Sequence, residues 1–275
     1  MNYYHERILA FIDVLGFREA IGKTVECING KVIEKLAETQ IIDNLFDEIN
    51  YQISIKYLFP EERKIIDQIT SQFSDSIVIS YSKENYIHHI FQDAYFLCVK
   101  AMESGFLLRG AIVLGKVIHS EKDKKLFGPA IIKAYEMENK KAKYPRIIID
   151  ENVFNIAKKN YLNCTNPDAE YDGLMKLVSK DYDNLYYINY IDKLYTGVDV
   201  GISGEHKHSM LVSNNLRKLK DSYKKNNKLK CKYLWLEKKY NNALTKLNQN
   251  MEISSSICDG SCCLWKKIIY PVWEQ

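Results

Sequence analysis

The sequence lacks the long apolar segments that carry a chain into or across a membrane. It has no run of about 18 uncharged apolar residues, which argues against a transmembrane helix. Its first residues, Met1–Arg7, are polar and lack the apolar core of a secretory signal peptide. We therefore expect a cytoplasmic protein that does not enter a membrane.

The sequence also lacks a disulfide or zinc pattern and a strong charge of one sign. Its seven cysteines are odd in number and widely spread, which favours free thiols in a reducing compartment. Cys258, Cys262 and Cys263 lie close together, but His206 and His208 are far upstream, so a structural zinc site is not favoured. The net charge of +4, from 39 basic and 35 acidic residues, gives no argument for a nucleic-acid partner.

The hydrophobic fraction of 46% in 275 residues is enough for a sizeable core. The composition changes near residue 200, so we place one domain at 1–200 and a basic helical extension at 201–275. Within 207–246, apolar residues recur at helical spacing among many lysines. The aromatic residues lie on the apolar stripe, which favours a helix packed on the body or on a dimer partner over one that binds nucleic acid.

Hydrophobic periodicity predicts the elements of the body. Strands are expected at 7–17, 71–81, 106–117 and 144–150, with a hairpin over 171–192; helices are expected at 18–27, 31–58, 86–102, 130–143 and 151–159. This order indicates an α+β fold of the ferredoxin-like or palm type. Its central sheet would be antiparallel or mixed, with helices on one face.

Two apolar segments, Ile8–Phe17 and Gln72–Ser80, each carry one aspartate, Asp13 and Asp75. A buried and unpaired carboxylate is costly, and two on neighbouring strands can lower that cost by sharing a bound cation. Mg²⁺ is usually held by one or two carboxylates together with substrate phosphates. The pattern therefore suggests a metal site that acts on a phosphate compound. The alternative is that each aspartate caps a strand or pairs with a lysine.

Four segments in order resemble the motifs of class III nucleotidyl cyclases. Phe11–Phe17 resembles the first-strand motif, and Phe73–Ser76 resembles the hairpin with the second metal aspartate. Leu108–Gly115 resembles the strand whose arginine contacts the triphosphate, and Phe127–Glu138 resembles the helix after the base-reading loop. The resemblance covers about residues 8–150 and none of the rest.

The resemblance implies a metal site and a phosphate contact. Asp13, Asp75 and the Val14 carbonyl would hold two divalent ions, Mg²⁺ or Mn²⁺, as in two-metal catalysis of an in-line displacement. Arg109 would hold a phosphate through its planar guanidinium. The alternative for Arg109 is a buried salt bridge, for instance to one of those aspartates.

Further positions follow from the same resemblance. The expected substrate contacts are Gly16, Phe17, Ser71, Lys125 and Lys133. Ser71 and Lys125 stand where adenylate cyclases of the family have their base-reading residues. Ile132 and Glu136 stand where the family has its transition-state asparagine and arginine, and neither matches.

These departures leave two interpretations open: a cyclase fold without catalysis, or a branch with another base. The motif set and size look like the bacterial pyrimidine cyclases of Pycsar anti-phage systems. That likeness implies synthesis of cyclic UMP or cyclic CMP from UTP or CTP, as a signal for a separate effector protein. It also implies a homodimer with active sites at the subunit interface. An adenylate or guanylate cyclase and a non-catalytic nucleotide-binding or dimerisation module remain alternatives.

Overall fold

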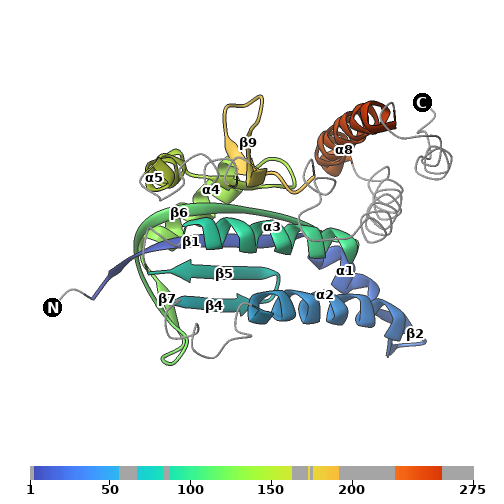
Figure 1. The fold of residues 1–275 in the computed structure, drawn as a ribbon. Coiled ribbons are helices and arrows are strands. Elements are labelled where there is room, and N and C mark those ends of the chain that lie inside the picture. Colours follow the sequence, from blue (N-terminus) through green and yellow to red (C-terminus); the bar gives the residue numbers. More distant parts are fainter. Residues whose placement is uncertain are drawn as a thin grey trace. The chain divides into compact units, whose positions relative to one another are not determined.

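The computed structural model describes residues 3–55, 67–82, 87–162, 173, 176–191 and 227–255 (Figure 1). The strands are β1 (His5–Leu15), β2 (Val25–Ile28), β3 (Lys31–Glu34), β4 (Gln68–Phe73), β5 (Ser76–Tyr81), β6 (Leu107–Ser120), β7 (Lys125–Phe127), β8 (Ile147–Ile149), β9 (Val178–Lys180) and β10 (Tyr186–Ile188). The helices are α1 (Phe17–Lys23), α2 (Leu36–Ile55), α3 (Ile87–Glu103), α4 (Pro129–Lys141), α5 (Glu151–Leu162) and α8 (Asn227–Ser255). The fold is α+β, as the sequence predicts.

An eight-stranded sheet organises the body. Its order is β4-β5-β1-β6-β8-β10-β9, with β7 paired to β6 beside this path. The β6–β8 pair is parallel and the other pairs are antiparallel, so the sheet is mixed. β1 lies in the middle of the sheet, between β5 and β6. Its successive residues Ile8, Leu9 and Ala10 are all fully buried, so both faces of the sheet are covered at this strand.

Helices cover both faces of this sheet, which corrects the expectation of helices on one face. α4 supplies Ala130 and Ala134 to a core cluster with Leu9 and Val113. Side chains alternate along a strand, so the buried Ile8 and its neighbours Ala10 and Ile12 face the other way. α3 packs on β1, β5 and β6 and also on α2, so this helix pair covers that second face (Figure 1).

A hairpin replaces the first part of the long helix expected over 31–58. β2 and β3 pair through a turn at Asn29 and Gly30, both with positive φ (52° and 76°). An Asn-Gly pair is a strong signal for this kind of hairpin turn. Val32 fits helical spacing in the sequence, but its side chain is 74% exposed in the hairpin. The helix begins only at Leu36.

Two shorter strands also differ from the expectation. The strand expected at 71–81 is a hairpin of β4 and β5, which turns at Ser74 and Asp75. The charged turn after β6 leads into β7, which pairs back onto β6. Turn residues between short strands carry little hydrophobic pattern, so periodicity merges or misses such strands.

The chain consists of two compact units, Met1–Tyr190 and Ile191–Gln275. In the second unit the structure describes α8, whose side chains Tyr233, Leu236 and Tyr240 are buried at helical spacing. The rest of the expected basic helix, and the cysteines from Cys258 on, lie outside the described residues. No helix among the described segments is long and apolar enough to cross a membrane.

Candidate functional site

Three of the sequence-predicted residues meet at one end of the central strands. Asp13 on β1 lies directly opposite Ser76 on β5 and directly opposite Arg109 on β6. Directly opposed residues of antiparallel strands point to the same face of the sheet. Asp75 occupies the adjoining turn, and its carbonyl accepts a hydrogen bond of 3.0 Å from the Val14 N–H. The sheet register therefore brings Asp13, Asp75 and Arg109 together.

The glycine after Arg109 lets the two strands approach at this point. A Cβ at Gly110 would lie 2.4 Å from the carbonyl oxygen of Phe11. Any side chain there would push β6 away from β1 and disturb the pairing of Asp13 with Arg109. The Arg-Gly pair of the motif therefore has a structural reason in this fold.

Arg109 has a second acidic neighbour that the sequence analysis missed. Its guanidinium forms an ion pair with Glu138 on α4, while the nearest Asp13 oxygen is 3.9 Å away. Glu138 is only 2% exposed, on the α4 face that also buries Ala130 and Ala134. Ala130, Ala134 and Glu138 recur at every fourth position, and this spacing could have placed Glu138 on the buried face of the helix from the sequence alone. A carboxylate in line with two buried alanines must face the sheet.

The acidic residues can be compared with the needs of a hard divalent cation. No group of three or more His, Cys, Asp or Glu side chains in the described part of the chain is arranged to hold a metal ion. Two carboxylates with backbone and substrate oxygens are nevertheless a usual Mg²⁺ ligand set. Asp13 is 24% exposed on its side chain, and Arg109 pairs more closely with Glu138 than with it. Asp13 is thus partly exposed, and Asp75 lies in the adjoining turn, where its carbonyl contacts Val14.

The other expected residues beside the two acidic strands have clear structural positions. Val14 is buried and donates its N–H to Asp75. Gly16 precedes α1 with a φ of +78°, a conformation that glycine adopts without strain. Phe17 is buried and packs edge to face with Phe46, at 5.7 Å between ring centroids. Phe17 thus faces the core.

The two candidate lysines lie farther along the chain. Lys125 is exposed on β7, opposite Ser120. Lys133 on α4 forms an ion pair with Asp150, and a carboxylate oxygen of Asp150 accepts from the Asn152 N–H at the start of α5. Each lysine lies outside the group formed by Asp13, Asp75 and Arg109.

The positions where the family has its transition-state pair lie on the outer side of α4. Ile132 is 61% exposed, and Glu136 forms an exposed ion pair of 3.2 Å with Lys140. Neither residue belongs to the buried face of the helix. Within this chain, Glu138 is the α4 residue that contacts Arg109.

Ser71 belongs to a polar chain on the same face of the sheet as Asp13. Its hydroxyl is 2.9 Å from Nε2 of His119, whose Nδ1 is 2.8 Å from the hydroxyl of Ser80. Nε of Arg7 donates to that Ser80 oxygen at 2.8 Å. Burial, together with the charge of Arg7, lowers the pKa of His119 to about 4. The imidazole is therefore neutral near pH 7.

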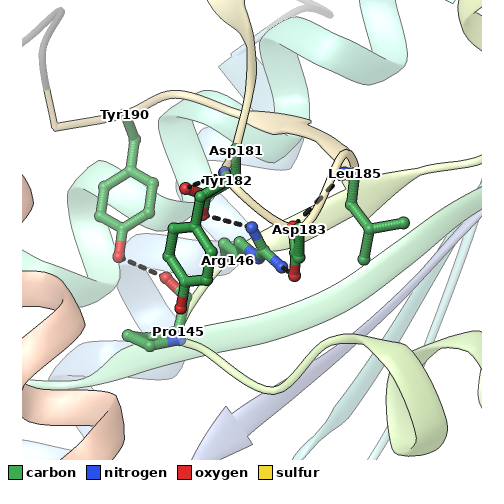
Figure 2. A network of polar contacts seen from close by, with 7 residues as sticks. All are labelled: Pro145, Arg146, Asp181, Tyr182, Asp183, Leu185 and Tyr190. Carbon is green, nitrogen blue, oxygen red and sulfur yellow. Dashed lines mark hydrogen bonds and ion pairs between the residues drawn. The ribbon is translucent and has the colours of Figure 1, made fainter.

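A second buried arginine braces the strand that carries Arg109. The Gly110 N–H donates to the carbonyl of Arg146 at 3.3 Å. Figure 2 shows the Arg146 guanidinium between the carboxylates of Asp181 and Asp183, with which it forms ion pairs. Nearby, the Tyr190 hydroxyl donates to the Pro145 carbonyl at 2.8 Å. The β9–β10 hairpin is thereby fixed beside β8, the strand that pairs with β6.

Solved structures match this chain, whereas no protein-family model and no curated sequence does. The adenylyl cyclase CyaB from P. aeruginosa is 14% identical over 68% of this chain and 94% of that chain, with a TM-score of 0.38. The monomeric guanylyl cyclase domain of the RhoGC fusion protein from the aquatic fungus Blastocladiella emersonii is 15% identical over 67% of this chain and 95% of that one, with a TM-score of 0.41.

A bacterial light-regulated adenylyl cyclase is 13% identical over 56% of this chain, with a TM-score of 0.38, and the match spans 45% of its own length. The solved structures to which this chain is similar thus include adenylyl and guanylyl cyclases, at low identity.

Proposed function

We propose that the protein is a pyrimidine nucleotidyl cyclase. It converts UTP or CTP to the 3′,5′-cyclic nucleotide and pyrophosphate. The observation that carries the proposal is the meeting of Asp13, Asp75 and Arg109 at one end of β1, β5 and β6. Two carboxylates beside an arginine form a site for a triphosphate with its divalent ions.

In this reaction the ribose 3′-oxygen bonds to the α-phosphorus, the bond to pyrophosphate breaks, and the 3′-hydroxyl loses its proton. Asp13, Asp75 and the Val14 carbonyl would hold two Mg²⁺ or Mn²⁺ ions, which activate the hydroxyl and neutralise the triphosphate when bound. Arg109 binds a phosphate through its guanidinium. Glu138, on α4, fixes the position of that guanidinium through its ion pair with Arg109.

The base and the biological role are the finer parts of the proposal. Ser71 and Lys125 stand where adenylate cyclases of the family have their base-reading residues, which favours another base. The likeness of the motif set to Pycsar cyclases supports a role in anti-phage defence. The cyclic product would then be read by a separate effector protein.

The active form is proposed to be a homodimer with two sites at the subunit interface. We expect light scattering to give about twice the chain's mass for the active protein. Dilution to the monomer should abolish product, because each site would need residues from both copies. A monomer with full cyclase activity would contradict the dimer but not the reaction.

The direct test is incubation with each of the four nucleoside triphosphates and Mn²⁺, followed by mass measurement of the product. We expect cyclic UMP or cyclic CMP with pyrophosphate. Cyclic AMP or cyclic GMP as the main product would replace the proposal with a purine cyclase.

One observation favours a second candidate, a module that binds a nucleotide without cyclising it. Arg109 already has a buried acidic partner in Glu138, which competes with a phosphate for the guanidinium. Binding of a triphosphate that needs no divalent ion and gives no cyclic product would establish this module instead.

A further inference from the structure

The β2–β3 hairpin exposes apolar side chains on both of its faces. It forms a two-stranded sheet of its own beside α1, away from the eight-stranded sheet (Figure 1). Every residue of its two strands is exposed, and these residues include Val25, Ile28, Val32 and Ile33. An isolated two-stranded hairpin is at best marginally stable in water. Apolar side chains exposed together in this way indicate an interaction surface.

The charges around the hairpin favour a protein as the partner. From residue 18 to residue 38 the chain carries four basic residues, Arg18, Lys23, Lys31 and Lys35, and four acidic ones, Glu19, Glu26, Glu34 and Glu38. A nucleic acid or an anionic membrane attracts a surface with an excess of positive charge. The balanced charge here, around apolar side chains, instead suits another protein surface.

The outer edge of β3 is open for pairing. The Lys35 N–H donates to the Thr24 carbonyl at 2.6 Å, which fixes the residues that bond across the hairpin. In steps of two from Lys35, Ile33 also bonds to β2, whereas the N–H and C=O groups of Val32 and Glu34 point the other way. Among the described residues, neither Val32 nor Glu34 has a backbone partner on that outer side. An edge with such groups is a template for another strand.

We infer that the outer edge of β3 pairs with the same edge of a second copy of this chain. A two-fold axis at Ile33 makes the two strands antiparallel, with Ile33 opposite the partner's Ile33 and Val32 opposite the partner's Glu34. Val32 and Glu34 then share four backbone hydrogen bonds with the partner, and the two hairpins become one four-stranded sheet. Two apolar side chains meet at its centre.

The charges favour the β3 edge over the β2 edge. The equivalent pairing of β2, through the outward groups of Val25 and Cys27, would place Glu26 directly opposite the partner's Glu26. Like charges in that position are destabilising. On the β3 edge the like charges that approach are Lys31 and the partner's Lys35, beyond the end of β3. Lys35 already forms an ion pair of 2.9 Å with Glu26, which offsets that approach.

Light scattering over a range of protein concentrations tests the pairing. Wild type should double its mass as the concentration rises, whatever its mass when dilute. Val32→Pro should raise the concentration needed for doubling by at least about tenfold, because it removes two of the four hydrogen bonds. The hairpin tolerates this proline, since the Val32 N–H does not bond to β2. The matched control is Cys27→Pro, opposite Val32 on the outer edge of β2, which should leave the doubling unchanged.

Cross-linking tests the register of the pairing. In a Cys27→Ser background, Ile33→Cys should form disulfide-linked pairs of chains on mild oxidation. Ile28→Cys, on the same face of the hairpin but on β2, should not exceed that background. A constant wild-type mass, equal effects of Val32→Pro and Cys27→Pro, or cross-linking through Ile28→Cys alone would overturn the inference.

The inference does not depend on the proposed function, since it concerns backbone pairing far along the chain from Asp75 and Arg109. Product formation measured on the same samples separates the two. A chain that makes a cyclic nucleotide without doubling its mass overturns the inference and leaves the cyclase. A chain that doubles its mass as expected but makes no cyclic product overturns the cyclase and keeps the inference.

Discussion

Asp13→Asn is expected to lower the rate of cyclic-product formation about a thousandfold while the fold remains intact. Asp75→Asn should have a similar effect. A catalytic metal supplies several kcal/mol of transition-state stabilisation, and about 4 kcal/mol corresponds to about three powers of ten in rate. Asparagine keeps the shape of the side chain but loses the charge that attracts a divalent ion.

The fold should survive because the strand pairing does not depend on either carboxylate. Asp13 is partly exposed, and Arg109 keeps its closer partner Glu138 when the Asp13 charge is lost. We therefore expect a melting temperature close to that of wild type. Mn²⁺ titration with substrate present should show weaker binding in both variants.

The matched control is Asp43→Asn, an identical change at an exposed position on α2. It should retain wild-type activity. Wild-type turnover in Asp13→Asn or Asp75→Asn would mean that the two aspartates hold no catalytic ion. A loss of activity accompanied by unfolding would instead show that the carboxylates are structural.

The sequence singles out Asp13 and Arg109 because each interrupts an apolar strand, and Asp75 because it stands at the turn just before one. A charge in such a strand is rare, so its position is informative without any knowledge of the fold. Glu138 is different: its spacing from Ala130 and Ala134 places it on the buried face of α4, but its contact with Arg109 depends on how α4 lies on the sheet, which periodicity alone does not specify.

The secondary structure likewise divides into elements that the hydrophobic pattern predicts and elements that it misses. The long buried strands β1 and β6 and the helices α3 and α4 agree with the hydrophobic pattern, because burial on a known face fixes their period. The β2–β3 hairpin does not, because its apolar residues are exposed and its identity depends on the Asn29-Gly30 turn. Turn chemistry would have been the better guide there.

Arg146→Met is expected to cost the body about 3–5 kcal/mol of stability, the range for breaking a buried ion pair. Arg146 is fully buried, and the Asp181 side chain that it contacts is almost as buried (Figure 2). Methionine fills much of the volume but leaves the Asp181 charge without its partner. The cost should fall on the region beside β6, since the Arg146 backbone accepts from Gly110.

Urea unfolding with and without a compensating change separates this charge effect from a packing effect. Adding Asp181→Leu to Arg146→Met should recover much of the lost stability, because no buried charge remains. Lys180→Met, next to Asp181 but on an exposed side chain, should change stability little. A loss below about 1 kcal/mol in Arg146→Met, or no recovery in the double variant, would show that the packing of the arginine stem matters more than its charge. The expected result would instead assign the stability of the region around β8 and the β9–β10 hairpin to the ion pairs of Arg146.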